Sequence, residues 1–279
     1  MRIRRGTLLS VITLLALCVG AEGNDGMEDH VPIVILSDAE FTAENGVRDG
    51  TGTIDDPYVI SNWRIDAKRA DHCIRIENVS SAFRIEDCVL VGASVYAARL
   101  VGVERAELVG SCVSASVFGV VWEWCTRCSV CDCSFDEIDW EAVTLVGSTG
   151  CEVTGCLFVE GGPAIELRER STGSKFVGNV FLPECRTGIR FVALSGGNLI
   201  ACNDFHGPVC ASESYNRWND TDGNGNYWSR YHGPDRDGDG VGDTSFIVLG
   251  GARELDRHPA MSPLHPGAAT EWDRCGPER

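Results

Sequence analysis

The sequence predicts an all-β fold: a single-stranded, right-handed parallel β-helix, or solenoid, with a cap at each end. Three observations predict it. A six-residue pattern recurs with nearly constant spacing through the middle of the 279 residues. The segments around it alternate apolar and polar side chains over short stretches, as half-buried strands do. The 32 glycines follow no collagen-like period and supply the turns that short strands need.

The repeated pattern is an apolar residue, two variable residues, Cys or Asn, one variable residue and an apolar residue. Its fourth positions lie 24, 21, 23, 23 and 24 residues apart: Cys88, Cys112, Cys133, Cys156, Asn179 and Asn203. A second alternating apolar pair, such as Ile74 with Ile76, lies 11 or 12 residues before each of them. Each repeat therefore holds at least two short strands. Repeats of this length stack as coils about 4.8 Å apart. A leucine-rich repeat has a similar period, but the fixed leucines and the helical segment that it requires are missing here.

Stacked coils place corresponding residues in columns along the solenoid. One predicted internal column consists of Phe135, Phe158, Phe181 and Phe205. A second consists of Ile85, Val109, Val130, Val153, Phe176 and Ile200. The aligned cysteines at 88, 112, 133 and 156 are predicted to form a buried stack of small, soft side chains. Burial of these columns is expected to hold one coil to the next.

The chain divides into five predicted parts: a signal peptide at 1–21, an N-terminal segment and cap at 22–57, β-helix repeats at 58–210, a C-terminal cap at 211–262 and a tail at 263–279. Caps are needed because an open solenoid exposes an unpaired strand edge and a layer of apolar side chains. An aromatic cluster after the last repeat is predicted to cover that layer: Tyr215, Trp218, Tyr227, Trp228 and Tyr231.

The first residues predict an extracytoplasmic location, in the periplasm, at the cell surface or outside the cell. Arg2, Arg4 and Arg5 precede an apolar run from Leu8 to Val19, the pattern of a secretory signal peptide. The run is shorter than the roughly 20 residues that cross a bilayer, and no later segment is both long and uncharged, so no transmembrane segment is expected. The formal charge of −17 would repel phosphates, which excludes a nucleic-acid partner.

An acidic loop, D-R-D-G-D-G-V-G-D at residues 235–243, predicts a calcium site. Carboxylates at nearly alternate positions surround a hard cation, and the glycines between them allow a tight turn. The predicted ligands are Asp235, Asp237, Asp239, Asp243 and the carbonyl of Val241. The twelfth position of the loop is Phe246, where an EF-hand has a bidentate Glu, so a weaker site or a further ligand is expected. The alternative is a solvated acidic turn.

The 14 cysteines suggest disulfides in an exported protein. Cys128 and Cys151 occupy equivalent positions in neighbouring repeats, so a disulfide between them is predicted. Cys185 and Cys210 form a second candidate pair. Cys125 and Cys128 have the C-x-x-C spacing of zinc and copper(I) sites, but the expected strand orientation separates the sulfurs in this region. Column and disulfide roles are therefore favoured over a metal site.

Two stretches that flank the repeats carry a resemblance to a known family. One is F-T-A-E-N-G-V-R-D-G-T-G-T-I-D-D-P-Y-V-I-S-N-W-R-I-D at 41–66. The other is G-N-Y-W-S-R-Y-H-G-P-D-R-D-G-D-G-V-G-D at 225–243, followed by D-R-H-P-A-M at 256–261. They resemble the NosD-like β-helices of the pectin-lyase-like superfamily, over roughly residues 33–262. The chain departs from that family in using Cys where such repeats usually stack Asn. The resemblance implies a periplasmic β-helix that binds copper or carbohydrate.

Three functions follow from these observations. The favoured one is a non-catalytic β-helix that binds a glycan or another surface component, because the clustered Asp pairs of pectin-cleaving β-helices are absent. The second is a polysaccharide lyase or glycoside hydrolase, with paired carboxylates in D-E-I-D-W-E at 136–141. Outward-facing Arg168 and Arg190 would then contact an acidic sugar, although such arginines usually protect a sheet edge. The third is a copper-handling accessory protein, which the scattered methionines and histidines support poorly.

Overall fold

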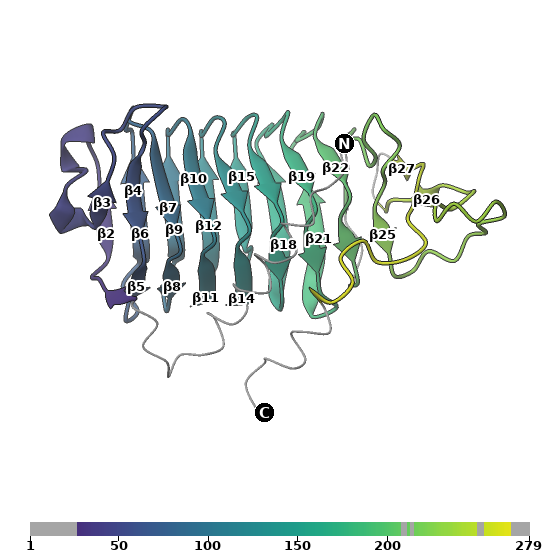
Figure 1. Cartoon of the computed structure of the whole chain (residues 1–279), viewed down its shortest axis with the longest axis horizontal. Coiled ribbons are helices and arrows are strands. Elements are labelled where there is room, and N and C mark those ends of the chain that lie inside the picture. Colours follow the sequence, from purple (N-terminus) through teal and green to yellow (C-terminus); the bar gives the residue numbers. More distant parts are fainter. Residues whose placement is uncertain (1–26, 208–210, 213–214, 250–253, 269–279) are drawn as a thin grey trace, which may run out of the picture.

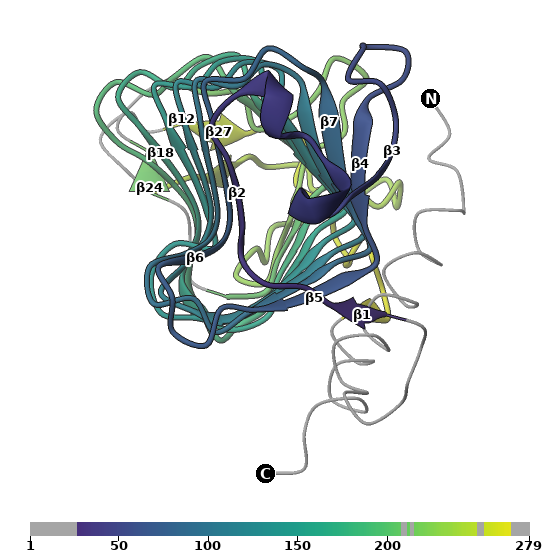
Figure 2. The ribbon, with the colours of Figure 1, turned by 90° about the vertical axis from the view of Figure 1, so that its left-hand side faces the viewer.

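The computed structural model describes residues 27–207, 211–212, 215–249 and 254–268. Within them the chain is a parallel β-helix without α-helices, as the repeats predict. The coils stack along one axis, from β2 and β3 at one end to β25, β26 and β27 at the other (Figure 1). Three walls of strands surround the interior when the solenoid is seen along that axis (Figure 2). The predicted signal peptide lies outside the described residues, and no helix within them is long and apolar enough to span a membrane.

Each coil contributes a short strand to each wall. The first wall is an eight-stranded sheet: β3 (Val47–Asp49), β4 (Tyr58–Ser61), β7 (Phe83–Glu86), β10 (Ala106–Val109), β13 (Ser129–Cys131), β16 (Glu152–Thr154), β19 (Lys175–Val177) and β22 (Leu199–Ala201). The second wall consists of β1 (Glu28–Asp29), β5 (Trp63–Asp66), β8 (Val89–Val91), β11 (Cys112–Ser116), β14 (Ser134–Ile138), β17 (Leu157–Phe158), β20 (Val180–Phe181), β23 (Asp204–Phe205) and β25 (Tyr227–Trp228). The third consists of β2 (Ile33–Ile35), β6 (His72–Glu77), β9 (Tyr96–Val101), β12 (Phe118–Glu123), β15 (Val143–Val146), β18 (Gly161–Arg168), β21 (Cys185–Phe191) and β24 (Ala211–Ser212).

The predicted phenylalanine column is confirmed. The rings of Phe135, Phe158, Phe181 and Phe205 are 4.7–5.0 Å apart in sequence order and within 8° of parallel. Trp228 continues the column at 4.5 Å from Phe205. The spacing between parallel strands equals a favourable stacking distance between aromatic rings, so the same register serves both interactions.

Two assignments in the predicted columns are wrong by one residue. Leu108, and not Val109, pairs with Ile85 and Val130. Val109 belongs to the outward-facing set, because successive side chains of a strand point to opposite faces. Likewise Ser111 takes the position assigned to Cys112: its hydroxyl accepts from the Cys88 amide at 3.1 Å. In the sequence, neighbouring residues of similar character on both sides of this turn allowed either alignment of the repeat.

The cysteine stack merges into an asparagine ladder along the solenoid. Cys156 N–H donates to Asn179 Oδ1 at 3.0 Å, and Asn179 N–H donates to Asn203 Oδ1 at 2.9 Å. Asn226 extends the ladder by one coil, since its Oδ1 accepts from the Asn203 amide at 3.1 Å. These side chains satisfy backbone groups at a turn where the chain changes wall and no strand partner is present.

The two ends of the solenoid are closed differently. At the N-terminal end, η1 (Asp38–Glu40) and η2 (Ala43–Asn45) follow β2, and Phe41 stacks on Tyr58 at 4.7 Å. At the C-terminal end, Trp218 and Trp228 are buried over the last apolar layer, as predicted. Tyr215 is 81% exposed and takes no part in this cover. A two-stranded antiparallel sheet completes the cap: β26 (Phe246–Ile247) and β27 (Leu255–Asp256).

Candidate functional site: a charged face on the third wall

The third wall bends inward between its two edges (Figure 2). Its outward side carries a row of paired arginine and glutamate side chains, which we call the charged face: Arg75, Glu77, Arg99, Glu123, Glu141, Glu166, Arg168 and Arg190. Parallel pairing brings them together across coils. Arg75 is beside Arg99, and Glu166 is beside Arg190 in the strand register.

The N-terminal half of the charged face is built around Arg99. Its Nε donates to Glu123 Oε1 at 2.8 Å, and its Nη1 donates to Glu77. Arg75 binds the same Glu77 carboxylate with two donors, at 2.7 and 3.0 Å. Hydrogen bonding to Arg75 lowers the pKa of Glu77 below its usual value. These four side chains therefore form one ion-pair network across three coils.

The C-terminal half buries two carboxylates. The side chains of Glu141 and Glu166 are only 1% and 2% exposed, whereas those of Arg168 and Arg190 are each 39% exposed. Arg168 Nη2 donates to Glu141 Oε1 at 2.8 Å, and Arg190 Nη2 donates to the same oxygen at 3.3 Å. Both arginines also bind Glu166. Two buried negative charges are thus balanced by two half-exposed positive ones, which buried carboxylates require.

Two polar atoms in this half have no hydrogen-bond partner among the residues that the structure describes. They are Glu141 Oε2 and Thr144 Oγ1, and both are buried. Thr144 pairs with Glu166 in the strand register, so its hydroxyl belongs to the same cluster. A buried polar atom without a partner is rare in folded proteins and requires an explanation.

An aromatic row runs beside the charged face, with one ring from each of three coils. Tyr96 and Phe118 are 5.5 Å apart, and Phe118 and Trp140 are 6.1 Å apart, between ring centroids. The Arg99 guanidinium is 5.8 Å from the Tyr96 ring, which ties the row to the charged face. Trp140 is 56% exposed. In the next coil Gly162 lies beside Trp140. A Cβ atom on Gly162 would be 2.3 Å from the Trp140 carbonyl oxygen, so the two backbones are in close contact.

The sequence identified part of this face. It singled out residues 136–141 for paired carboxylates and Arg168 and Arg190 as outward-facing, and the structure brings Glu141 to both arginines. Asp136 lies on β14 in the second wall, where burial raises the pKa of its carboxyl to about 6. Glu166, Thr144 and the aromatic row were missed. The 22-residue spacing of Tyr96, Phe118 and Trp140 is the pattern that would have revealed the row.

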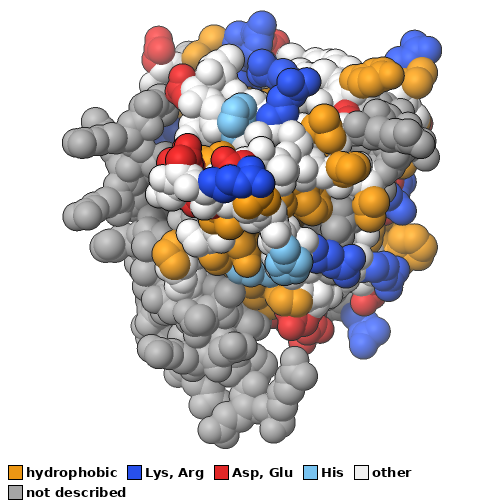
Figure 3. Space-filling model, turned by 90° about the vertical axis from the view of Figure 1, so that its right-hand side faces the viewer, with side chains coloured by type: hydrophobic (Ala, Val, Ile, Leu, Met, Phe, Trp, Pro, Cys, Tyr) orange, Lys and Arg blue, Asp and Glu red, His pale blue; other side chains and the backbone are white. Residues whose placement is uncertain are grey.

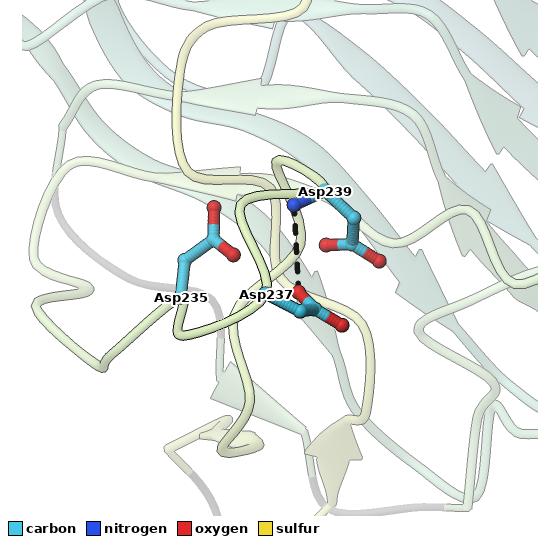
Figure 4. A group of neighbouring side chains, drawn as sticks. All are labelled: Asp235, Asp237 and Asp239. Carbon is cyan, nitrogen blue, oxygen red and sulfur yellow. Dashed lines mark hydrogen bonds between the residues drawn. The ribbon is translucent and has the colours of Figure 1, made fainter.

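The acidic loop brings together three of its four predicted aspartates. One carboxylate oxygen each of Asp235, Asp237 and Asp239 lies within 4.8 Å of the others (Figure 4). The chain folds this way because Asp235 accepts from the Gly238 and Gly240 amides at 2.8 and 3.1 Å. The amide of Val241 donates to Asp239 at 2.8 Å.

The fourth predicted aspartate of this loop lies outside the group. Asp243 accepts from the Arg236 amide at 2.9 Å and pairs with the Arg236 guanidinium at 3.7 Å. Its carboxylate is therefore already neutralised by a neighbour. The calcium site that the sequence predicts thus has three adjacent carboxylates in the structure.

The predicted disulfides are not formed. Cys128 and Cys151 do occupy equivalent positions in neighbouring coils, as the hydrogen bond from Glu152 N–H to the Cys128 carbonyl at 2.9 Å shows. Both cysteines are nevertheless free thiols. Each thiol instead donates to a backbone carbonyl, Cys128 to Val103 at 3.7 Å and Cys151 to Thr149 at 3.6 Å. Cys185 is also a free thiol, and Cys210 lies outside the described residues.

These thiols do not form an accessible copper site. Copper(I) binds deprotonated thiolates that it can reach. Cys125, Cys128 and Cys151 are 0–1% exposed. Hydrogen bonding to Cys128, together with burial, raises the pKa of Cys125 and Cys151 well above the usual value. Hydrogen bonding to Cys125 and Cys151 lowers the pKa of Cys128, so the three sulfurs interact with one another inside the core, away from solvent.

The C-terminal cap carries a shallow pocket between residues 215–220 and β27. Figure 3 shows this end of the solenoid, where arginine and histidine side chains lie among exposed hydrophobic ones. The Glu254 carboxylate in the pocket wall accepts from the Trp218 indole at 2.6 Å. This contact holds the buried Trp218 in the cap, so Glu254 has a structural role.

Comparisons with known proteins match the chain to one family. No curated protein matches the sequence. Among solved structures, an alginate lyase from Paenibacillus sp. str. FPU-7 has 11% identity and a TM-score of 0.36, in an alignment that covers 72% of this chain and 88% of that one. Residues 52–233, well over half of the chain, match the family described as Periplasmic copper-binding protein (NosD). The repeats, the solenoid and this match together show that the chain belongs to the NosD family.

Proposed function

We propose that this protein is a non-catalytic, extracytoplasmic β-helix that binds a glycan along the third wall. The observation that carries the proposal is the aromatic row of Tyr96, Phe118 and Trp140 beside the charged face. Sugar rings have apolar C–H faces that pack on aromatic rings and hydroxyls that bond to planar polar side chains. The row and the face offer both kinds of contact side by side, over successive coils.

The arrangement of the carboxylates favours binding over cleavage. A glycosidase needs one carboxyl group that protonates the leaving oxygen and a second that attacks or activates water. Glu141 and Glu166 are the paired carboxylates of this face, and both bind Arg168 and Arg190. Their side chains are at most 2% exposed, so a substrate has no direct access to them. Cleavage of a polysaccharide is the alternative that the same experiment tests.

The experiment is a glycan-array and polysaccharide-degradation screen on the purified protein, with two tryptophan variants. Trp140→Ala removes the exposed end of the aromatic row. Trp124→Ala is the matched control. Trp124 is 58% exposed, close to the 56% of Trp140, and it comes directly after the last residue of β12, whereas Trp140 contacts Phe118 at the first residue of that strand. We expect binding that Trp140→Ala weakens about tenfold, the equivalent of one lost aromatic contact, and that Trp124→Ala retains. Cleavage products would support the enzyme, and neither binding nor cleavage would refute the proposal.

Export and calcium complete this proposal. Arg2, Arg4 and Arg5 with the apolar run behind them support secretion through a signal peptide, and the name of the family is periplasmic. Three clustered carboxylates in an exposed loop support a calcium ion at Asp235, Asp237 and Asp239, since the cation would relieve their mutual repulsion. The ion would stiffen the loop that joins β25 to β26 in the C-terminal cap.

A further inference from the structure

We propose that a disulfide between Cys112 and Cys275 attaches the C-terminal end of the chain to the outer face of the second wall, over a strip of apolar side chains. The proposal goes beyond glycan binding and does not depend on it. It rests on three observations: the bonding state of Cys112, the column of residues to which Cys112 belongs, and the course of residues 264–268 along that column.

Cys112 differs from every other cysteine of the described residues. The other ten are free thiols, whereas Cys112 is disulfide-bonded. Its partner is therefore a cysteine outside the described residues. The sequence offers three such cysteines: Cys18, Cys210 and Cys275.

Cys112 belongs to a column that the second wall turns outward. Its neighbour Val113 pairs with Phe135 of the buried phenylalanine column, and successive side chains of a strand point to opposite faces. In strand register, the outward column consists of Cys112, Ser134, Leu157, Val180 and Asp204. Each of these side chains is at most 4% exposed. Other parts of the chain therefore cover them, although they face away from the interior.

The described end of the chain covers the C-terminal part of this column. It runs back from the cap along the solenoid (Figure 1). The amides of Leu264 and His265 donate to the two carboxylate oxygens of Asp204, at 2.8 and 2.7 Å. Three residues later, Ala268 packs in a buried cluster with Leu157, Val159, Val180 and Leu182. The chain thus advances from Asp204 in the direction of Cys112.

The residues that follow Ala268 are long enough to reach Cys112. Val180 and Cys112 are three strand spacings apart, which is about 14 Å along the column. Cys275 comes seven residues after Ala268, and seven extended residues span up to about 23 Å. A disulfide requires Cα atoms within about 7 Å of each other, and this length of chain meets the requirement.

The other two cysteines do not meet it. Cys210 directly precedes β24, which lies four strand spacings beyond β12, the strand that follows Cys112 in the same coil. Four spacings amount to about 19 Å, and one peptide unit shortens this by at most about 4 Å. Cys18 lies in the predicted signal peptide, which export removes.

Formation of this bond suits an exported protein. The thiols of Cys112 and Cys275 give up two electrons and two protons to the disulfide of an extracytoplasmic oxidant, which becomes a dithiol. The bond then keeps the end of the chain over Leu157 and Val180, whose exposure to water would be unfavourable. It also closes a long loop, which restricts the unfolded chain and stabilises the folded one.

The test maps the disulfides of the full protein after oxidation in a glutathione buffer. Free thiols are alkylated in denaturant without reductant, and trypsin then cuts after Arg105, Arg127 and Arg274. We expect peptide 106–127 to be linked to peptide 275–279 and to separate from it on reduction. Cys112→Ser should abolish this link. Cys125→Ala, in the same tryptic peptide, is the matched control and should retain it.

A second measurement tests whether the bond holds the chain over the apolar strip. Cys275 comes after every strand of the solenoid in the sequence, so Cys275→Ser should leave the coils folded. We expect this variant to melt about 5–10 °C lower than wild type and to bind more of an apolar dye. The control is Cys131→Ser, which changes a free thiol on β13 in the first wall and should leave both values unchanged.

The remaining outcomes would overturn the proposal. A link from Cys112 to Cys210 or Cys18, or alkylation of Cys112 as a free thiol, would contradict the assignment of Cys275. A reducible dimer in electrophoresis would show a bond between two copies instead of one within the chain. If the bond forms but Cys275→Ser changes neither the melting temperature nor dye binding, the bond does not hold the cover in place. Glycan binding is unaffected by any of these results.

Discussion

The phenyl rings of Phe181 and Phe205 lie 4.7 Å apart and only 2° from parallel, although the two residues are 24 positions apart in the chain. One repeat separates them, so the stacking distance of the rings reports the height of one coil. The interior of this solenoid is therefore a set of columns. A change in one coil is felt by the coil before it and the coil after it.

Removal of one ring from this column should destabilise the fold strongly. Phe158 stacks at 5.0 Å on Phe135 and at 5.0 Å on Phe181, and it is 1% exposed. Phe158→Ala leaves a cavity between two coils, and we expect it to lower the free energy of unfolding by about 3–5 kcal/mol. Denaturant unfolding followed by circular dichroism measures the change. The control is Leu194→Ala, at a side chain that is 68% exposed, and an equal effect of both substitutions would contradict the column.

The asparagine rungs should contribute more to stability than the cysteine rungs of the same column. Asn203 accepts from the Asn179 amide at 2.9 Å and donates to the Phe176 carbonyl at 2.9 Å. Asn203→Ala leaves both backbone groups buried without partners, which costs about 3 kcal/mol. Cys156 offers weak thiol contacts, to the carbonyls of Thr154 at 3.4 Å and Val130 at 3.7 Å, so Cys156→Ala should cost about 1 kcal/mol. Equal losses in denaturant unfolding would show that the ladder hydrogen bonds do not matter.

The N-terminal cap should weaken in acid. Asp38 accepts from the Ser80 hydroxyl at 2.7 Å and from the Ser80 and Ser81 amides at 2.9 and 2.8 Å, and these bonds lower the pKa of its carboxyl from 3.8 to about 2. Because the folded-state pKa lies below the unfolded one, this contribution is fully present above about pH 4 and is lost as the pH falls towards 2. Melting temperatures of wild type and Asp38→Asn should differ at pH 6 and converge near pH 2. A constant difference across that range would rule out Asp38 as the cause.

Calcium should stabilise the C-terminal cap through three of the loop aspartates. At a free concentration about 100 times the dissociation constant, binding to the folded state alone contributes about 2.7 kcal/mol. We expect calcium to raise the melting temperature of wild type and of Asp243→Asn, because Asp243 is paired with Arg236 outside the carboxylate group. Asp237→Ala combined with Asp239→Ala should abolish the shift. If a chelator does not change the melting temperature of the wild type, the prediction is wrong and the loop is a solvated acidic turn.

The core thiols should resist modification in the folded protein. Ten cysteines of the described residues are free, and Cys131 is the one among them that is partly exposed. Burial raises the pKa of Cys88 to about 12, which suppresses the reactive thiolate. Peptide mapping after native treatment with a thiol reagent should therefore find label on Cys131 before Cys88, Cys133 and Cys156. In guanidinium all four should react, and rapid native labelling of Cys88 would contradict its burial.

The sequence by itself determined the architecture. A period of 21–24 residues, alternation within short stretches and recurrent Phe at equivalent positions predict stacked coils, because in a solenoid each repeat contacts only its neighbours. The period thus encodes the long-range contacts, such as that between Phe158 and Phe181. Local sequence patterns also predicted the aromatic cover of the last coil and the clustering of the loop aspartates.

Only the tertiary structure decided the register at single positions and the composition of the charged face. Leu108 and Val109 are both apolar, and Ser111 and Cys112 are both small, so alternation alone did not fix which of each pair points inward. Glu141 and Arg190 are 49 residues apart and meet because two successive coils and the bend of the third wall bring their long side chains together. Side-chain length and wall curvature are three-dimensional properties, and the spacing of a repeat does not contain them.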